Sequence, residues 1–390
     1  MKLAKLTHKK PHKFHIIKRL NVDKKKMWLV RIASFVVAFL LAGVITSIIK
    51  PGSFMPFTVN MFLGVFDPND MGMLFNFLGE AAILLLITIS LLPAFKMKYW
   101  NIGAEGTCTI GCLVTALITS YCPSSMNSAL VIIIAIIGAV AAGMLWSFIP
   151  AIFKAKFNTN ETLFTLMMNY VAILLTTWVV TSLNRGGSGT WGLIRNHQLP
   201  EIDGVPCLFI IIFAVIITVL MILYIKKTKH GYEIEVIGGS DNTAKYIGIN
   251  KSKVIVRSLL LSGALCGFVG FLIVAGKEHT LNPNVLNSRG FTGVLIAWLG
   301  HFSPVECILY SFLSAFFSKG AFNAASFCGM DSNIFSGLIS GIFFLIVVVT
   351  EFFVSYKIAR IEDNSDTSNV DPAPPIEEIK DDLETSKEAL

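Results

Sequence analysis

A few ionisable residues lie within or at the edges of the long apolar runs of this sequence, where any chemistry would stand out. They are Arg31, Glu80, Glu105, Glu161 and Arg257. A charged side chain is costly in hydrocarbon, so such residues are candidates for function, for example as the ion-coupling groups of a transporter. Arg257 lies near the predicted cytoplasmic rim, from which its long side chain can reach water.

The acids also have a structural interpretation. Glu105 and Glu161 each follow an asparagine, Asn101 and Asn160, and fall in the first turn of a predicted helix. A carboxylate at that position complements the positive helix end and can accept hydrogen bonds from free backbone N–H groups. This structural role is the favoured one for both residues. Glu80 instead lies in the outer half of a predicted helix, among polar neighbours.

Patterns that would indicate an enzyme are missing. The sequence has no Walker A motif, no G-x-S-x-G, no H-E-x-x-H and no carboxylate cluster suited to a metal. Its seven cysteines form no C-x-x-C pair, and Cys108 and Cys112 share a helix face without a histidine or carboxylate nearby. We therefore predict no catalytic residue, no metal site and no cofactor in this chain.

The elements that carry these residues are predicted to be transmembrane helices. Of 390 residues, 54% are hydrophobic and only 15% charged, and long apolar runs recur along the chain. The predicted spans are 28–49, 73–95, 101–122, 128–153, 163–182, 206–225, 254–276, 289–300, 305–322 and 334–354. The eighth is too short to cross a core of about 30 Å and is expected to be a broken or re-entrant segment. Small-residue runs at 138–143 and 263–267 permit close helix contacts.

Loop charges predict the orientation. Basic residues fall on alternate loops, at 96–98, 154–156 and 226–253, whereas loops 50–72 and 123–127 hold almost none. This alternation satisfies the positive-inside rule with the N-terminus in the cytoplasm. The expected fold class is thus an all-α polytopic membrane protein of about ten helices, with both termini cytoplasmic.

Three parts of the chain are distinguished by composition. Residues 1–27 form a basic cytoplasmic segment, in which the charge indicates an inner membrane end and not a nucleic-acid site. Residues 28–355 form the membrane domain. Residues 356–390 form an acidic tail that is predicted to be disordered in the cytoplasm.

The longest internal loop, 226–253, carries helix signals of its own. Ser240 or Asp241 can cap a short helix through "NTAKY", and Gly248 can close it in a left-handed conformation. A short helix at the inner face would suit docking of a cytoplasmic partner. Spacing alone equally allows a plain surface loop.

Four stretches resemble one protein family in order and spacing. They are "WNIGAEG" (100–106), "KAKFNTNETLFTLMMNYVA" (154–172), "GYEIEVIGGSDNTAKYIGINKSKV" (231–254) and "GFTGVLIAWLGHFSP" (290–304). They resemble permease subunits of bacterial ABC importers for nucleosides and simple sugars, within the branched-chain amino-acid and ribose permease group. The family's usual first motif is close to F-N-I-G-A-E-G-Q. Here Thr107 replaces the glutamine, and Thr292 stands where aspartate is usual.

The resemblance implies a multi-pass protein of the bacterial cell membrane, forming half of a translocation pathway for nucleosides. Its implied partners, besides membrane lipid, are a second, related permease subunit in a heterodimer, a cytoplasmic ABC ATPase and an extracellular substrate-binding lipoprotein. ATP and Mg²⁺ would bind the ATPase and not this chain. The residues expected to dock the ATPase are Gly231, Tyr232, Asp241, Ala244 and Gly248. Candidates for the pathway or the permease core are Glu80, Asn101, Glu105, Asn160, Glu161, Asn169 and Trp298.

Three alternatives remain open at this point. The same architecture serves ribose-, galactose- or other simple-sugar permeases. An ion-coupled secondary carrier would use one of the membrane carboxylates and would not need ATP. A membrane scaffold would bind its partners through the acidic tail.

Overall fold

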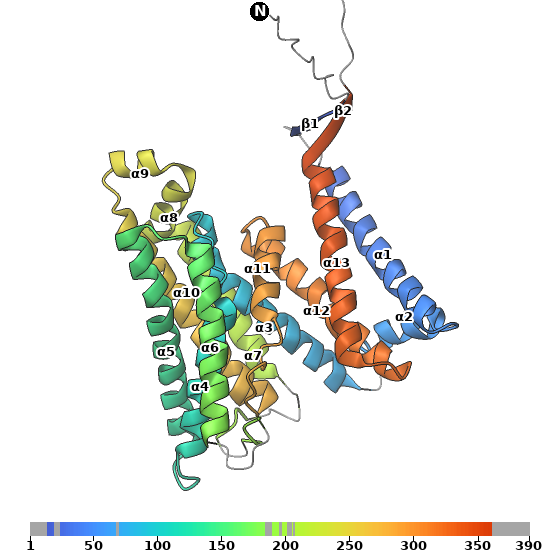
Figure 1. Cartoon of the computed structure of the whole chain (residues 1–390), viewed down its shortest axis with the longest axis horizontal. Helices are drawn as coiled ribbons and strands as arrows, with labels where there is room; N and C mark the ends of the chain where they lie inside the picture. Colours follow the sequence, from blue (N-terminus) through green and yellow to red (C-terminus); the bar gives the residue numbers. More distant parts are fainter. Residues whose placement is uncertain are drawn as a thin grey trace, which may run out of the picture. The chain divides into compact units, whose positions relative to one another are not determined.

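Figure 1 shows a computed structural model of the chain, which describes residues 14–18, 24–67, 70–183, 189–194, 197–200, 205 and 207–360. Two compact units are distinguished. One comprises residues 29–351 and holds the helices of the membrane domain; the other comprises residues 1–28 and 352–390.

The described residues of the larger unit are mostly helical. In chain order the helices are α1 (Lys24–Ile49), α2 (Phe54–Leu63), α3 (Met71–Lys96), α4 (Ala104–Tyr121), α5 (Ser128–Phe157), α6 (Glu161–Leu183), α7 (Leu208–Lys227), α8 (Lys229–Gly239), α9 (Asp241–Tyr246), α10 (Lys251–Ile273), a π-helical turn η1 (Val274–Glu278), α11 (Arg289–Leu299), α12 (Pro304–Phe327) and α13 (Ser332–Ser355). The first residues of α1 and the last of α13 belong to the smaller unit.

Every predicted span coincides with one of these helices. Among the described residues, eight helices are long and apolar enough to cross a membrane. The other two spans are α4, with 18 residues, and α11, with 11. The fold is therefore that of a polytopic α-helical membrane protein.

Helix α2 was not predicted, because residues 50–72 were interpreted as a loop. Its ten residues are too few to give a spanning signal. Phe57 and Met61 are nevertheless fully buried, and the backbone of Met61 lies so close to Gly320 of α12 that a Cβ there would be 2.7 Å from its carbonyl oxygen. Tertiary packing therefore stabilises this short helix.

Helices α4, α5 and α10 form the tightest part of the core, as the small-residue runs predicted, and α4 to α6 and α10 lie together in Figure 1. A Cβ at Gly267 would lie 2.2 Å from the carbonyl oxygen of Ala139, and one at Gly143 would lie 2.3 Å from that of Gly263. The two backbones are in direct contact here, so only glycine fits.

The predicted helix in the internal loop is confirmed as α9. The Ser240 hydroxyl accepts a bond from the Thr243 N–H at 3.4 Å, and Gly248 has a φ of +78°. Helix α8 was not predicted, because the helix signals read in this loop were only those from Ser240 to Gly248. Gly238 allows a close approach, since a Cβ there would lie 2.0 Å from the carbonyl oxygen of Lys96.

The smaller unit contains an antiparallel ladder between β1 (Phe14–Lys18) and β2 (Tyr356–Arg360), with Phe14 opposite Arg360. The all-α prediction included no strand in these terminal segments. Both runs are rich in β-branched and aromatic residues, which favour pairing once the chain brings them together. The rest of the predicted acidic tail, 361–390, lies outside the described residues.

Candidate functional site

The candidate site is built around the start of α11, the short helix that was expected to be broken or re-entrant. Its 11 residues span about 16 Å, roughly half of a hydrocarbon core of about 30 Å. Before it, Asn287 and Ser288 adopt left-handed backbone conformations, with φ of +46° and +62°. This conformation costs a non-glycine residue energy, so the surrounding contacts must hold it in place.

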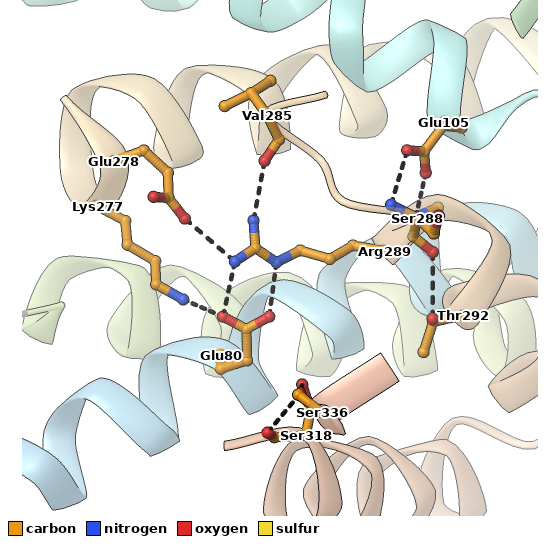
Figure 2. Close-up of polar contacts among 11 residues, drawn as sticks. Glu80, Glu105, Lys277, Glu278, Val285, Ser288, Arg289, Thr292, Ser318 and Ser336 are labelled. Atoms are coloured by element: carbon orange, nitrogen blue, oxygen red, sulfur yellow. Dashed lines mark hydrogen bonds and ion pairs between the residues drawn. The ribbon is translucent and has the colours of Figure 1, made fainter. Parts of the chain in front are cut away.

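Glu80 of α3 ties that start to η1, the turn that follows α10. Arg289 donates from Nε to one carboxylate oxygen of Glu80 at 2.6 Å and from Nη2 to the other at 3.1 Å (Figure 2). The same Nη2 bonds to Glu278 at 3.1 Å, and Lys277 bonds to Glu80. Only 4% of Glu80 is exposed. The two cations thus compensate a buried carboxylate that would otherwise be very costly.

Glu105 holds the same helix start from the other side. Its carboxylate oxygens accept bonds from the backbone N–H groups of Ser288 at 3.1 Å and Gly290 at 2.7 Å (Figure 2). Sequence analysis correctly put this residue in the first turn of its own helix, α4. The N–H groups that it binds lie at the start of α11, on the preceding Ser288 and on Gly290, however, and not in α4. Glu105 therefore stabilises a helix end at membrane depth.

Asn169 joins two of the sequence motifs. Its amide donates to the carbonyl of Ile102 at 2.8 Å and accepts from the N–H of Gly106 at 2.8 Å, so α6 fixes the turn that carries Glu105. Within that turn, the side chain of Asn101 accepts a bond from the N–H of Gly103 at 2.9 Å. The turn is thus held from both its own chain and α6.

The other residues predicted from the second motif lie at the start of α6. Asn160 accepts a bond from the N–H of Leu163 at 3.2 Å, as expected of a cap. Glu161 pairs with Lys154 at the end of α5 at 2.6 Å. Neither residue reaches the Glu80 and Glu105 contacts. Trp298 is also separate from those contacts: it lies towards the end of α11 and is 43% exposed.

A comparison with known protein families now bears on this arrangement. Residues 73–348 match the family described as the permease component of the branched-chain amino acid transport system. The chain belongs to this permease family. The matched region contains the whole α3, α4, α10 and α11 arrangement, so the permease is an integral membrane transport component.

Among the curated relatives of the permease, one is the guanosine ABC transporter permease protein NupP of Bacillus subtilis, 28% identical over 69% of this chain and 78% of its own. The nucleoside ABC transporter permease protein NupB of Lactococcus lactis is 25% identical over 61% of this chain and 69% of its own. The glucose ABC transporter permease protein TsgB13 of Haloferax volcanii is 24% identical over 72% of this chain and 77% of its own.

The internal loop of the permease presents α8 and α9 as one packed unit. Ala244 is buried, whereas Tyr232 is exposed. Asp241 pairs with Lys251, and Gly231 lies where a Cβ would be 2.1 Å from the carbonyl oxygen of Ile225. The predicted docking residues are therefore divided between the surface of this unit and its supporting contacts.

One contact below α8 adds a partner that the sequence did not predict. Arg257, whose side chain is 32% exposed, also donates to Glu233 of α8 at 2.8 Å. This hydrogen bond lowers the pKa of Glu233 below its ordinary value. Tyr246, at the end of α9, is 93% exposed and was not among the predicted docking residues.

Sequence analysis also missed three charged residues of the membrane network: Lys277, Glu278 and Arg289. Several charges close together are typical of a solvent-exposed loop, so these residues were not expected at a buried site. The short helix that follows them is the available signal, because a segment that cannot span the membrane alone must be surrounded by protein.

A second network, which joins α1, α12, α13 and the turn after α11, was likewise unforeseen. Arg31 pairs with Glu351 at 3.2 Å and Glu306 at 3.4 Å, and His301 contacts the same two acids at 3.1 Å each. Within the described residues, no group of three or more His, Cys, Asp or Glu side chains could hold a metal ion.

Proposed function

We propose that this permease is one of two membrane subunits of an ATP-driven importer for nucleosides. The observation that carries the proposal is its similarity to NupP and NupB, named for guanosine and nucleosides, over 69% and 61% of this chain. TsgB13, named for glucose, supports the second candidate, a simple sugar. Nucleosides are favoured because NupC and NupQ, named for nucleosides and guanosine, are also similar to the chain.

Ten crossings with both termini in the cytoplasm are part of the proposal. In support, His301 after α11 contacts Glu306 at the start of α12 and Glu351 near the end of α13, and both acids contact Arg31 near the start of α1. These ends therefore share one side of the protein. The ring of Phe302 lies 5.6 Å from that of Phe95, at the inner end of α3, on the same side.

Segment 279–299 then accounts for one crossing in two pieces. At its beginning, the carbonyl of Leu281 accepts a bond from the N–H of Trp191 at 2.7 Å, in the loop before α7. Just after its end, Phe302 contacts Phe95 at the inner end of α3, on the side of the membrane opposite to Leu281. Coil followed by a half-helix is permitted at membrane depth because protein contacts satisfy its backbone groups.

The proposed partners follow from the importer function. A cytoplasmic ABC ATPase, with its own ATP and Mg²⁺, would dock on α8 and α9. A second, related permease would complete the pathway, and an extracellular lipoprotein would deliver the nucleoside. The length of the internal loop and the packed α8 and α9 that it carries support an inner-side docking role, which an ion-coupled carrier would not require.

Uptake by the complete complex in proteoliposomes tests the function. We expect guanosine accumulation that needs internal ATP and the binding protein and that persists when ion gradients are dissipated. Accumulation that collapses with the ion gradient and ignores ATP would identify a secondary carrier. Uptake of glucose without guanosine would favour the sugar permease.

A further inference from the structure

Polar side chains are exposed on the segment that leads into α11. Asn287 and Ser288 are exposed and Thr292 is half-exposed. Their depth follows from Gly293, where a Cβ would lie 2.7 Å from the side chain of Ile87 in α3. Ile87 precedes the inner end of α3 by nine residues, or about 14 Å. The start of α11 therefore lies well inside a core of about 30 Å.

Lipid is a poor neighbour for this surface. Amide and hydroxyl groups in hydrocarbon lack partners for their remaining hydrogen bonds, and each missing bond is costly. The Thr292 hydroxyl donates to the Ser288 carbonyl at 3.1 Å, which leaves its lone pairs free. Such groups at this depth require water, a polar solute or another protein beside them.

The exposed residues continue as a stripe along one side of α11. Ser288, Thr292, Leu295 and Trp298 follow at helical spacing, and the last two are exposed. The stripe is polar at its outer end and aromatic at its inner end. Glu105 and Glu80 hold the start of this helix (Figure 2). The ion pairs and hydrogen bonds of these two acids thus hold in place a helix whose exposed stripe changes from polar to aromatic along its length.

We infer that Asn287, Ser288, Thr292 and Trp298 line the aqueous pathway and contact the nucleoside as it passes. This inference rests on the proposed function. A nucleoside offers hydroxyls on its ribose and donors and acceptors on its base edge, which amide and hydroxyl groups complement. The flat base suits an indole ring, on which aromatic surfaces stack.

Cysteine labelling in the complete complex tests whether water reaches the stripe. Asn287→Cys and Thr292→Cys are treated with a charged, water-soluble methanethiosulfonate, with the unaltered chain as background. The matched control is Leu174→Cys, which places a thiol at an exposed apolar position in the middle of α6. We expect both stripe variants to be labelled and the control not. We also expect guanosine with its binding protein to slow the labelling.

Transport kinetics test contact with the substrate. Thr292→Val keeps the side-chain shape and removes the hydroxyl, and we expect kcat/KM for guanosine to fall about three- to tenfold, as for one lost hydrogen bond. Thr181→Val is the control, because Thr181 likewise donates to the carbonyl four residues earlier, at 2.7 Å. Equal expression and melting temperature exclude a folding defect.

Three results would overturn the inference. The stripe cysteines could be as unreactive as the cysteine at position 174, or guanosine could fail to slow their labelling in a complex that transports it. Labelling could also occur only when the second permease is absent. The last would make the stripe a subunit interface. If the unaltered complex takes up glucose and not guanosine, the proposed substrate is wrong. Labelling with glucose as the protecting solute then still decides whether the stripe lines the pathway.

Discussion

Replacing Glu80 by glutamine should destabilise the permease through the two cations that the carboxylate now compensates. Four groups are linked by ion pairs: Glu80, Arg289, Lys277 and Glu278. Two are anions and two are cations, so their charges balance. Glu80→Gln leaves an excess positive charge where Arg289 has only 13% of its side chain exposed.

The size of the effect follows from burial. Removing one partner of a buried ion pair typically costs about 3–5 kcal/mol, because the remaining charge stays desolvated. For a chain of 390 residues that corresponds to a fall of roughly 4–6 °C in melting temperature. Adding Arg289→Gln restores the charge balance, since Lys277 and Glu278 remain. The double variant should therefore be more stable than Glu80→Gln alone.

Thermal unfolding of the purified protein in detergent measures these differences, and uptake in proteoliposomes reports the functional loss. Glu278→Gln is a matched control, because Glu278 is 34% exposed and forms only one of the contacts of Arg289; its effect should be smaller. The reasoning fails if Glu80→Gln melts within about 1 °C of the unaltered protein, or if Arg289→Gln adds its full cost to that of Glu80→Gln instead of offsetting it.

Three further outcomes are expected. Glu105→Gln offers one carbonyl oxygen to two N–H groups, so it should cost about 1–3 kcal/mol in thermal unfolding; an unchanged melting temperature would contradict the capping role. The hydrogen bond to Glu351 raises the pKa of His301 above 6.5, so its stabilisation should be complete below pH 6.5 and disappear as the pH rises through the higher, folded value. Unfolding against pH measures this, and His301→Gln should remove that part of the dependence. Gly238→Ala brings a Cβ to 2.0 Å from a backbone oxygen of α3 and should weaken ATPase co-purification, whereas Gly239→Ala, with nothing within 4 Å, should not; equal loss would argue against docking through α8.

Sequence patterns were sufficient for features that depend on neighbouring residues. The spanning helices followed from uninterrupted apolar runs, and the cap formed by Ser240 followed from its spacing to the N–H group that it bonds. Helix α2 escaped prediction because it is short and is stabilised by burial against α12. Local signals are weak wherever tertiary packing supplies most of the stability.

The sequence by itself determined that this is a polytopic membrane protein of the permease type, with a helix near residue 290 too short to span and carboxylates placed at helix starts. Only the tertiary structure decided which groups those carboxylates bind. Glu105 meets Ser288 across 183 positions of the chain, and Glu80 meets Arg289 across 209. Spacing along a chain encodes hydrogen bonds within one turn or helix. Contacts between distant segments depend on how the helices pack, and here that packing places a broken helix start between two buried acids.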